Sequence, residues 1–200
     1  NGIHIIDLTK TAEQLEKALA FAEKQAAAGH QILFVGTKRQ AKDPVRTAAM
    51  YAGQPYVVER WLGGMLTNST TTNGRIKKLK DLEGKMESGE LASRYNKLEV
   101  QRFQEQIDAM NHNYGGIKDM NGRPGAVFIT DILEDKNAVN EALKLGIPVI
   151  AIVDTNTDPT KIDYPIPAND DAVGVIKIIV DAIADAVQSG RGKKNAKAAA

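Results

Sequence analysis

Short, strongly apolar runs separate longer stretches in which apolar residues recur with helical spacing. The run Ile32–Val35 is apolar throughout, a pattern typical of a strand buried on both faces of a sheet. The same reasoning predicts strands at Ile32–Val35, at Tyr56–Val58, within Pro124–Asp131, at Ile147–Asp154 and at Asp163–Pro167. The last of these is predicted at a sheet edge, because its prolines remove ladder donors.

Helices are predicted between these strands. A capping box at Thr11–Gln14 indicates the start of a first helix, and Gly29 its end. Further helices are predicted from about Asp43 to Ala52, from Asn137 to Leu145, and from a cap at Asn169 or Asp170 to Gly190. The alternation indicates an α/β fold whose parallel sheet has helices on both faces, and we expect the strand order 2-1-3-4-5.

The stretch from Arg75 to about Tyr114 changes character. Its apolar residues recur three to five positions apart in two arms, charged residues fill the other positions, and glycines at 84 and 89 interrupt the pattern. This pattern predicts a helical hairpin with a coiled-coil seam, whose arms need one another and a second molecule at the tip. In the first arm the seam falls on Ile76, Leu79 and Leu82, and in the second on Leu91, Tyr95, Leu98, Phe103, Ile107, Met110 and Tyr114.

The predicted organisation is therefore one domain with an insertion. Residues 1–68 and 115–190 form a single α/β domain, residues 69–114 form the inserted hairpin, and residues 191–200 form a basic, disordered tail.

Composition narrows the class of protein. The 200 residues are 42% hydrophobic and 26% charged, include no cysteine, and carry a formal net charge of +1, which leaves room only for local basic patches. No run approaches the roughly 20 apolar residues of a membrane span, and no signal segment opens the chain. The chain begins at Asn1 without a methionine, so we expect that it starts partway into a longer protein.

Two loops carry the most suggestive chemistry. Gly36 ends the first buried strand, and Lys38 and Arg39 follow with no acid beside them, which favours an anion at the carboxyl edge of the sheet. We expect this loop to face Thr130–Asp131 across the point where the strand order reverses. In the loop Arg60–Asn68, the single tryptophan, Trp61, either stacks on a base or sugar or plugs the root of the loop.

Signals for catalysis are weak. The chain has neither a Walker sequence nor a Gly-x-Gly-x-x-Gly motif, and its three histidines are scattered, so a metal site is not predicted. Asp131, Asp154 and Asp158 lie at predicted strand ends. They could hold magnesium in a phosphotransfer enzyme, but the favoured interpretation is that they cap the segments that follow.

Several ordered motifs resemble bacterial small-subunit ribosomal protein S2. The most specific is Pro124–Pro148, through Val127-Phe128, Asp131, Asp135, Val139, Glu141 and Gly146-Ile147-Pro148. The others are Ile32–Ala41, Arg60–Asn68, Gly115–Met120, Asp154–Pro159, Asp163–Pro167 and Asn169–Asp171. The resemblance runs from Asn1 to about Gly190; the family's usual N-terminal segment is missing, and the hairpin from Lys85 to Gln106 matches weakly.

The resemblance implies a flavodoxin-like sheet with a protruding hairpin and a structural, non-enzymatic role in the ribosome. It implies binding to small-subunit rRNA between head and body, and help in placing ribosomal protein S1. It further implies a cytoplasmic or organellar ribosomal location, no membrane, no homo-oligomer, and no cofactor beyond magnesium brought by rRNA.

The candidate rRNA-binding residues are Lys38, Arg39, Gln40, Arg60, Trp61, Asn68, Arg75, Lys78 and Lys118. Replacing Lys38 and Arg39 together by alanine is expected to weaken rRNA association and leave folding intact. Two alternatives stay open at this point. One is a nucleotide- or flavin-binding enzyme that uses the Gly36 loop with Asp131 or Asp154, and the other is a hairpin adaptor that binds only proteins.

Overall fold

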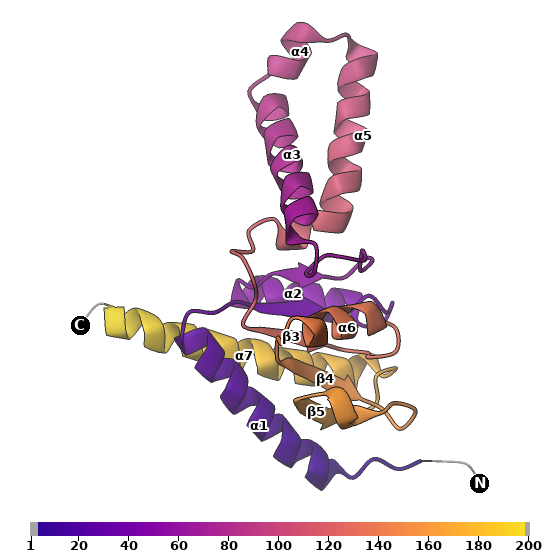
Figure 1. Ribbon diagram of the computed structural model, residues 1–200, viewed down its shortest axis with the longest axis vertical. Helices are drawn as coiled ribbons and strands as arrows, with labels where there is room; N and C mark the ends of the chain where they lie inside the picture. Colours follow the sequence, from indigo (N-terminus) through magenta and orange to yellow (C-terminus); the bar gives the residue numbers. More distant parts are fainter. Residues whose placement is uncertain (1–3, 199–200) are drawn as a thin grey trace.

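The computed structural model describes the backbone of residues 4–198 and the side chains of residues 4–194. One parallel sheet lies at its centre, with a helical hairpin projecting from it (Figure 1). The strand order is β2-β1-β3-β4-β5, which confirms the predicted order and the flavodoxin-like topology. The strands are β1 (Ile32–Val35), β2 (Tyr56–Val57), β3 (Ala126–Ile129), β4 (Val149–Val153) and β5 (Tyr164–Pro167).

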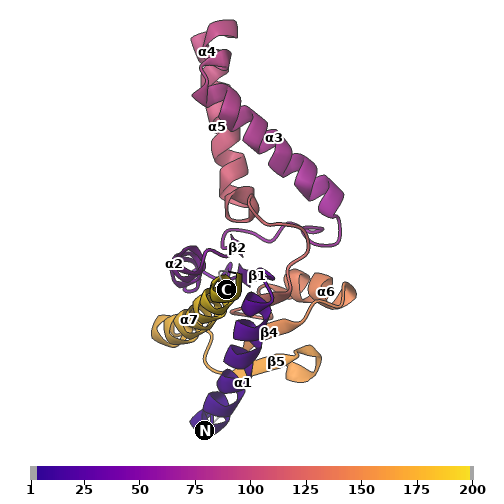
Figure 2. The same ribbon diagram turned by 90° about the vertical axis from the view of Figure 1, so that its left-hand side faces the viewer.

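The strands are apolar throughout because helices cover both faces of the sheet. Helices α1 (Leu8–Ala27), α2 (Lys42–Ala52) and α7 (Val173–Ala198) pack on the face that carries Ile32 and Phe34, whereas α6 (Lys136–Lys144) packs on the opposite face. Figure 2 shows α2 and α7 on one side of the sheet and α6 on the other. All four residues of β1 are at most 1% exposed, as the predicted two-faced burial requires.

The first helix begins earlier than its sequence pattern predicts. The side chain of Asp7 accepts a hydrogen bond from Thr9 N at 3.0 Å and caps α1, so the predicted capping box at Thr11–Gln14 is wrong. Thr11 lies inside the helix, and its hydroxyl donates to Pro167 O at 2.5 Å. This bond ties α1 to β5, which is the predicted proline-bearing edge strand.

The hairpin consists of α3 (Ser69–Glu87), a short α4 (Glu90–Arg94) and α5 (Lys97–Tyr114). Its seam is built from Leu79, Leu82 and Ile107, with Phe103 and other partly buried side chains packed against them. The second arm is shorter than predicted. Asn96 and Glu99 form a capping box that starts α5 afresh, so Leu91 lies in α4 and Leu98, which is 60% exposed, is outside the seam. Ile76, at the root of the hairpin, belongs to the core under the sheet.

The predictions of a helix end at Gly190 and of a disordered tail from Arg191 are wrong for the described residues. Helix α7 continues to Ala198, while Ala199 and Ala200 lie outside the described residues. Gly190 is a point of close helix packing, because a Cβ there would collide with Glu23 O of α1 and lie 2.9 Å from Ala26 Cβ. One turn later, Lys193 Nζ lies 2.7 Å from Glu23 Oε1 and fastens the end of α7 to α1.

The Gly190 contact can be tested by substitution within one helix. We expect Gly190→Ala to lower the free energy of unfolding by about 1–3 kcal/mol, because the added methyl group forces α1 and α7 apart. Gly192→Ala is the matched control, since open space surrounds that position and alanine favours a helix by up to about 1 kcal/mol. Urea unfolding curves measure both changes. Equal stability of Gly190→Ala and the unsubstituted protein would contradict the close packing.

Candidate nucleic-acid interface

The carboxyl ends of β1, β2 and β3 bring the predicted loops to one edge of the sheet. Gly36 ends β1 and packs against the start of α2, where a Cβ would lie 2.7 Å from Val45 Cγ2 and 2.9 Å from Thr130 Oγ1. The loop that follows lies against the end of β3, and Lys38 Nζ is 3.0 Å from Asp131 Oδ2. The expectation that these two segments face each other is therefore confirmed.

Lys38 lies among acids that are distant in the sequence. Its Nζ is 3.0 Å from Asp131 Oδ2, 2.7 Å from Asp170 Oδ1 and 2.7 Å from Asp171 Oδ1. Burial lowers the pKa of Lys38, but the hydrogen bonds to these carboxylates have the larger combined effect and hold the pKa above its usual value. The ammonium charge is thus neutralised inside the protein, although the loop itself contains no acid.

A second contact holds the same loop. The carboxylate of Asp135, which is 1% exposed, accepts hydrogen bonds from Thr37 N at 3.2 Å and from Thr37 Oγ1 at 2.9 Å. Burial raises the pKa of Asp135 to about 6, and the two bonds from Thr37 oppose that rise without cancelling it. These contacts fix the backbone just before Lys38, and the neighbouring Arg39 is exposed.

The aspartates at the strand ends act as caps. Asp131 Oδ1 accepts hydrogen bonds from Leu133 N at 2.8 Å and Glu134 N at 3.0 Å, and Asp158 Oδ1 accepts one from Thr160 N at 2.9 Å. Asp154 accepts a bond from Thr155 N at 2.6 Å. Among residues 4–194, no group of three or more His, Cys, Asp or Glu side chains is arranged to hold a metal ion. Capping describes Asp131 and Asp158, but Asp131 is also paired with Lys38, and Asp154 Oδ2 accepts a hydrogen bond from the distant Asp170 N at 3.3 Å.

Glu141 on α6 organises the loop that follows β2. Its Oε1 accepts hydrogen bonds from Trp61 Nε1 at 3.0 Å and Gly64 N at 2.7 Å. Its Oε2 accepts bonds from Leu66 N, Thr67 N and Thr67 Oγ1, each at 3.0 Å. Burial raises the pKa of Glu141, but these donors together outweigh burial and bring the pKa below its usual value.

Trp61 forms the root of this loop. Its side chain is 7% exposed and packs in the core beneath the sheet, with its indole N–H bonded to Glu141. The sequence left two interpretations of Trp61 open, stacking on a base or sugar and a structural role at the root of the loop. The burial of Trp61 agrees with the structural role. Asn68 also has a structural contact, since its Oδ1 accepts a hydrogen bond from Thr71 N at 3.4 Å and caps α3.

The remaining predicted residues differ in how free their side chains are. Lys118 Nζ lies 3.1 Å from Glu83 Oε1 at the hairpin root, and Gln40 is half-buried. In contrast, the structure leaves four of the predicted cations exposed without an ion pair to any side chain of residues 4–194. These are Arg39, Arg60, Arg75 and Lys78. Lys77, which the sequence did not single out, shares this environment.

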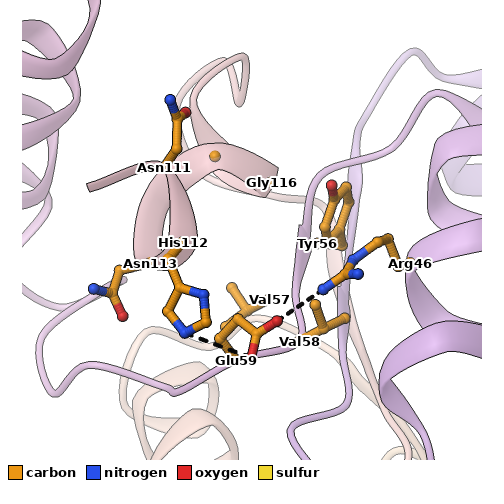
Figure 3. Close-up of a pocket in the computed structure, with 10 residues that line it drawn as sticks. Arg46, Tyr56, Val57, Val58, Glu59, Asn111, His112, Asn113 and Gly116 are labelled. Carbon is orange, nitrogen blue, oxygen red and sulfur yellow. Dashed lines mark hydrogen bonds and ion pairs between the residues drawn. The ribbon is translucent and has the colours of Figure 1, made fainter. Parts of the chain in front are cut away.

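A polar cavity of about 210 Å³ lies where the hairpin joins the sheet (Figure 3). Glu59 is one of the residues that line it, with Arg46 Nη2 at 2.8 Å and His112 Nε2 of α5 at 3.6 Å. Lys42 Nζ is 2.6 Å from Glu59 Oε2, and this hydrogen bond is the main reason that the pKa of Glu59 is below its usual value. The Glu59 contacts connect the hairpin to α2 and to the end of β2.

Comparison with known proteins gives these features a context. The family model described as ribosomal protein S2 matches residues 1–190. The chain belongs to the ribosomal protein S2 family. A relative from Coprothermobacter proteolyticus, named small ribosomal subunit protein uS2, is 50% identical over 191 residues, which cover 96% of this chain and 71% of the relative. Another uS2, from Chloroflexus aggregans, is 48% identical over 194 residues, or 97% of this chain and 81% of that relative.

Membership of the S2 family defines the broad role of the chain. It is a structural protein of the small ribosomal subunit, is located on the ribosome, and is not an enzyme. The ribosomal interpretation therefore replaces the alternative of a nucleotide- or flavin-binding enzyme. In the part of the chain that the structure describes, no helix is long and apolar enough to cross a membrane.

Lys38 and Arg39 should respond differently to substitution. Lys38→Ala removes the cation between carboxylates that are 9% and 5% exposed, so we expect the free energy of unfolding to fall by about 2–4 kcal/mol. Arg39→Ala alters an exposed side chain and should change stability by less than about 0.5 kcal/mol. Thermal and urea unfolding test the difference. If Lys38→Ala were as stable as Arg39→Ala, the internal role of Lys38 would be contradicted. The expectation that the double substitution leaves folding intact would then hold.

The contacts of Glu141 predict that the stability of the folded protein depends on pH. Glu141→Gln keeps the size of the side chain but loses the charge that attracts its donors, so we expect a loss of about 1–3 kcal/mol at neutral pH. Because the pKa of Glu141 is lowered in the folded protein, its extra stabilisation is fully present above the unfolded value of 4.5. That stabilisation is lost as the pH falls through the lowered pKa.

The measurement is the difference in unfolding free energy between the unsubstituted protein and Glu141→Gln from pH 7 down to pH 3. Glu16→Gln on the exposed face of α1 is the control and should show a difference near zero at every pH. A difference for Glu141→Gln that stayed constant below pH 4 would show that the carboxylate is not what holds the loop.

Proposed function

We propose that the chain binds small-subunit rRNA through a basic rim formed by Arg39, Arg60, Arg75 and Lys78. The observation that carries this proposal is their exposure without carboxylate partners among the described side chains, whereas Lys38 and Lys118 are paired internally. Arg39 and Arg60 follow the adjacent parallel strands β1 and β2 and so lie at the same edge of the sheet. Arg75 and Lys78 are one turn apart on α3, which begins where the Arg60 loop ends.

The chemistry of the rim suits the backbone of folded RNA. Guanidinium groups present several donors and form paired hydrogen bonds with phosphate oxygens. Because A-form RNA presents phosphates and ribose hydroxyls more readily than base edges, such a rim recognises shape. The buried position of Trp61 agrees with this mode, since it offers no exposed ring for base stacking. Any magnesium in the complex would come with the RNA.

The other predicted residues support the rim from behind. Lys38 fixes the loop that presents Arg39, and Trp61 with Asn68 fixes the loop that joins Arg60 to α3. Lys118 braces the hairpin root through Glu83. We infer that these residues position the rim, whereas Gln40 lies beside it and is half-buried.

We further propose that the chain acts in the cytoplasm, binds between head and body, and helps to place ribosomal protein S1. Tyr95 and Leu98 near the hairpin tip are 43% and 60% exposed, and exposed apolar side chains of this kind favour protein contacts. This division assigns RNA to the rim and protein to the tip. It keeps part of the adaptor alternative, because a hairpin shortened between Leu82 and Phe103 should retain rRNA binding and lose S1 retention.

The rim predicts a salt-dependent loss of affinity. We expect the double variants Arg39→Ala/Arg60→Ala and Arg75→Ala/Lys78→Ala to rebind small subunits stripped of their own S2 protein at least about ten times more weakly. Each lost phosphate contact should reduce the slope of log affinity against log salt concentration by about 0.7–0.9. Filter binding or sedimentation at several salt concentrations measures both quantities.

Lys10→Ala/Lys17→Ala is the matched control, because it removes two exposed cations from α1. That control should rebind normally and keep its salt slope. Equal losses in the control and the rim variants would indicate a general charge effect. Unchanged rebinding of the rim variants would contradict the proposal that the rim binds rRNA.

A further inference from the structure

A second basic site lies at the opposite end of the sheet from the basic rim. A cavity of about 200 Å³ opens where β1 and β2 begin, beside the C-terminal part of α7. Three of its lining side chains are basic, two are amides, and none is a carboxylate. They are His30, Arg191, Lys194, Gln31 and Gln54, with Ala26, Gly29 and Gly53 completing the wall.

Two glycines make room for the cations. Gly29 and Gly53 end α1 and α2 with φ of +87° and +59°, a conformation that side chains disfavour. A Cβ at Gly29 would collide with Lys194 Nζ, and a Cβ at Gly53 would collide with Arg191 Nη1. The two cations therefore lie directly against the backbone, on the floor of the cavity.

The charge balance of this cavity is positive. The ends of α1 and α2 carry partial negative charge, but Arg191 Nη1 donates to Ala52 O and Gly53 O and offsets one of them. Within residues 4–194, the other guanidinium nitrogens of Arg191 donate no hydrogen bond to a protein group, so they can donate to a ligand. Lys194 forms no ion pair with the side chains of residues 4–194, whereas the adjacent Lys193 is paired with Glu23.

Two further cavities lie next to this one along β2. Gln31, Gly53 and Gln54 also line a neighbouring cavity of about 260 Å³, which extends to Tyr56, Gly116 and the carboxylate of Asp119. Tyr56 and Gly116 in turn line the cavity of Figure 3, where Arg46 and His112 are paired with Glu59. Of the three cavities, only the first is lined by basic side chains without a carboxylate.

The edge of the sheet along β2 is covered by the chain itself. Gly116, in the short 3₁₀-helix η1 (Gly115–Ile117), packs so closely on Tyr56 O that a Cβ there would collide with it. An added β-strand would need that edge open. A partner at this end of the sheet must therefore bind through side chains, and the basic side chains of the first cavity favour a negatively charged one.

We propose that the pocket of His30, Arg191 and Lys194 binds a backbone phosphate of RNA. The proposal rests on the proposed function and extends it with a site at the other end of the sheet. Phosphate accepts hydrogen bonds from guanidinium and ammonium groups, which Arg191 and Lys194 supply, whereas Gln54 Nε2 already donates to Ala52 O and Gly53 O. RNA is the phosphate-bearing partner that the proposed function supplies.

The test compares three probes on the isolated protein by NMR of its backbone amides. The probes are inorganic phosphate, a short oligouridylate, and a polyglutamate of matched charge. We expect saturable shifts at Gly29, Gly53 and Gln54 with oligouridylate, at least about ten times tighter than with inorganic phosphate. The variant His30→Gln/Lys194→Gln should lose these shifts. Lys177→Gln, on an exposed part of the same helix, should keep them.

The outcomes separate the possible ligands. Shifts with inorganic phosphate alone, equally tight binding of polyglutamate, or no shift at these amides would each overturn the proposal, the second in favour of an acidic protein segment. The spectrum of the double variant also reports whether it is folded.

Rebinding to stripped subunits separates this site from the basic rim. There, His30→Gln/Lys194→Gln should lower affinity about three- to tenfold and reduce the salt slope by about 0.7. If the double variant rebinds like the unsubstituted protein, this site fails and the rim stands. If the rim variants rebind normally while the oligouridylate shifts persist, the rim fails and this site stands.

Discussion

The ammonium group of Lys38 holds together three carboxylates that would otherwise repel one another at the carboxyl edge of the sheet. Asp131 follows β3, and Asp170 and Asp171 precede α7, so one cation joins two separate parts of the chain to the end of β1. Removing that charge would leave buried acids unpaired, which costs more than the ion pairs themselves contribute. The edge of the sheet therefore has a fixed shape before any partner arrives.

Ion pairs inside the protein determine which of the predicted cations remain exposed and unpaired among the described residues. The predicted residues separate into Lys38 and Lys118, whose charges are paired inside the protein, and Arg39, Arg60, Arg75 and Lys78, which are exposed. Glu141 has a corresponding role for the second loop, since one carboxylate collects five hydrogen bonds and sets the start of the hairpin. A rigid base of this kind leaves the loops that carry the exposed arginines with little backbone entropy to lose on binding.

Local patterns predicted the sheet well because each strand carries its own signal. Ile32–Val35 reads as a buried strand and is one, and the prolines of β5 placed it correctly at an edge. The failures involve partners that are distant in the sequence. Gly190 looks like a helix stop, but it marks the contact with Glu23 of α1, and Thr11 looks like a cap, but it bonds to Pro167. Lys38 looked free because the acids that pair with it lie 93 to 133 residues further along the chain. The resemblance marked Glu141 and Asp135 as motif residues, yet only the fold shows what each carboxylate holds.

The central claim is that exposed arginines on a rigid edge, supported by buried charges, form the surface that contacts rRNA. Amide hydrogen exchange, measured for the free protein and for the protein bound to the small subunit, tests it most directly. The account predicts new protection in residues 37–41, in residues 60–68 and in the first turns of α3, with little change on the exposed face of α6. Protection confined to α6, with those loops exchanging as in the free protein, would contradict it.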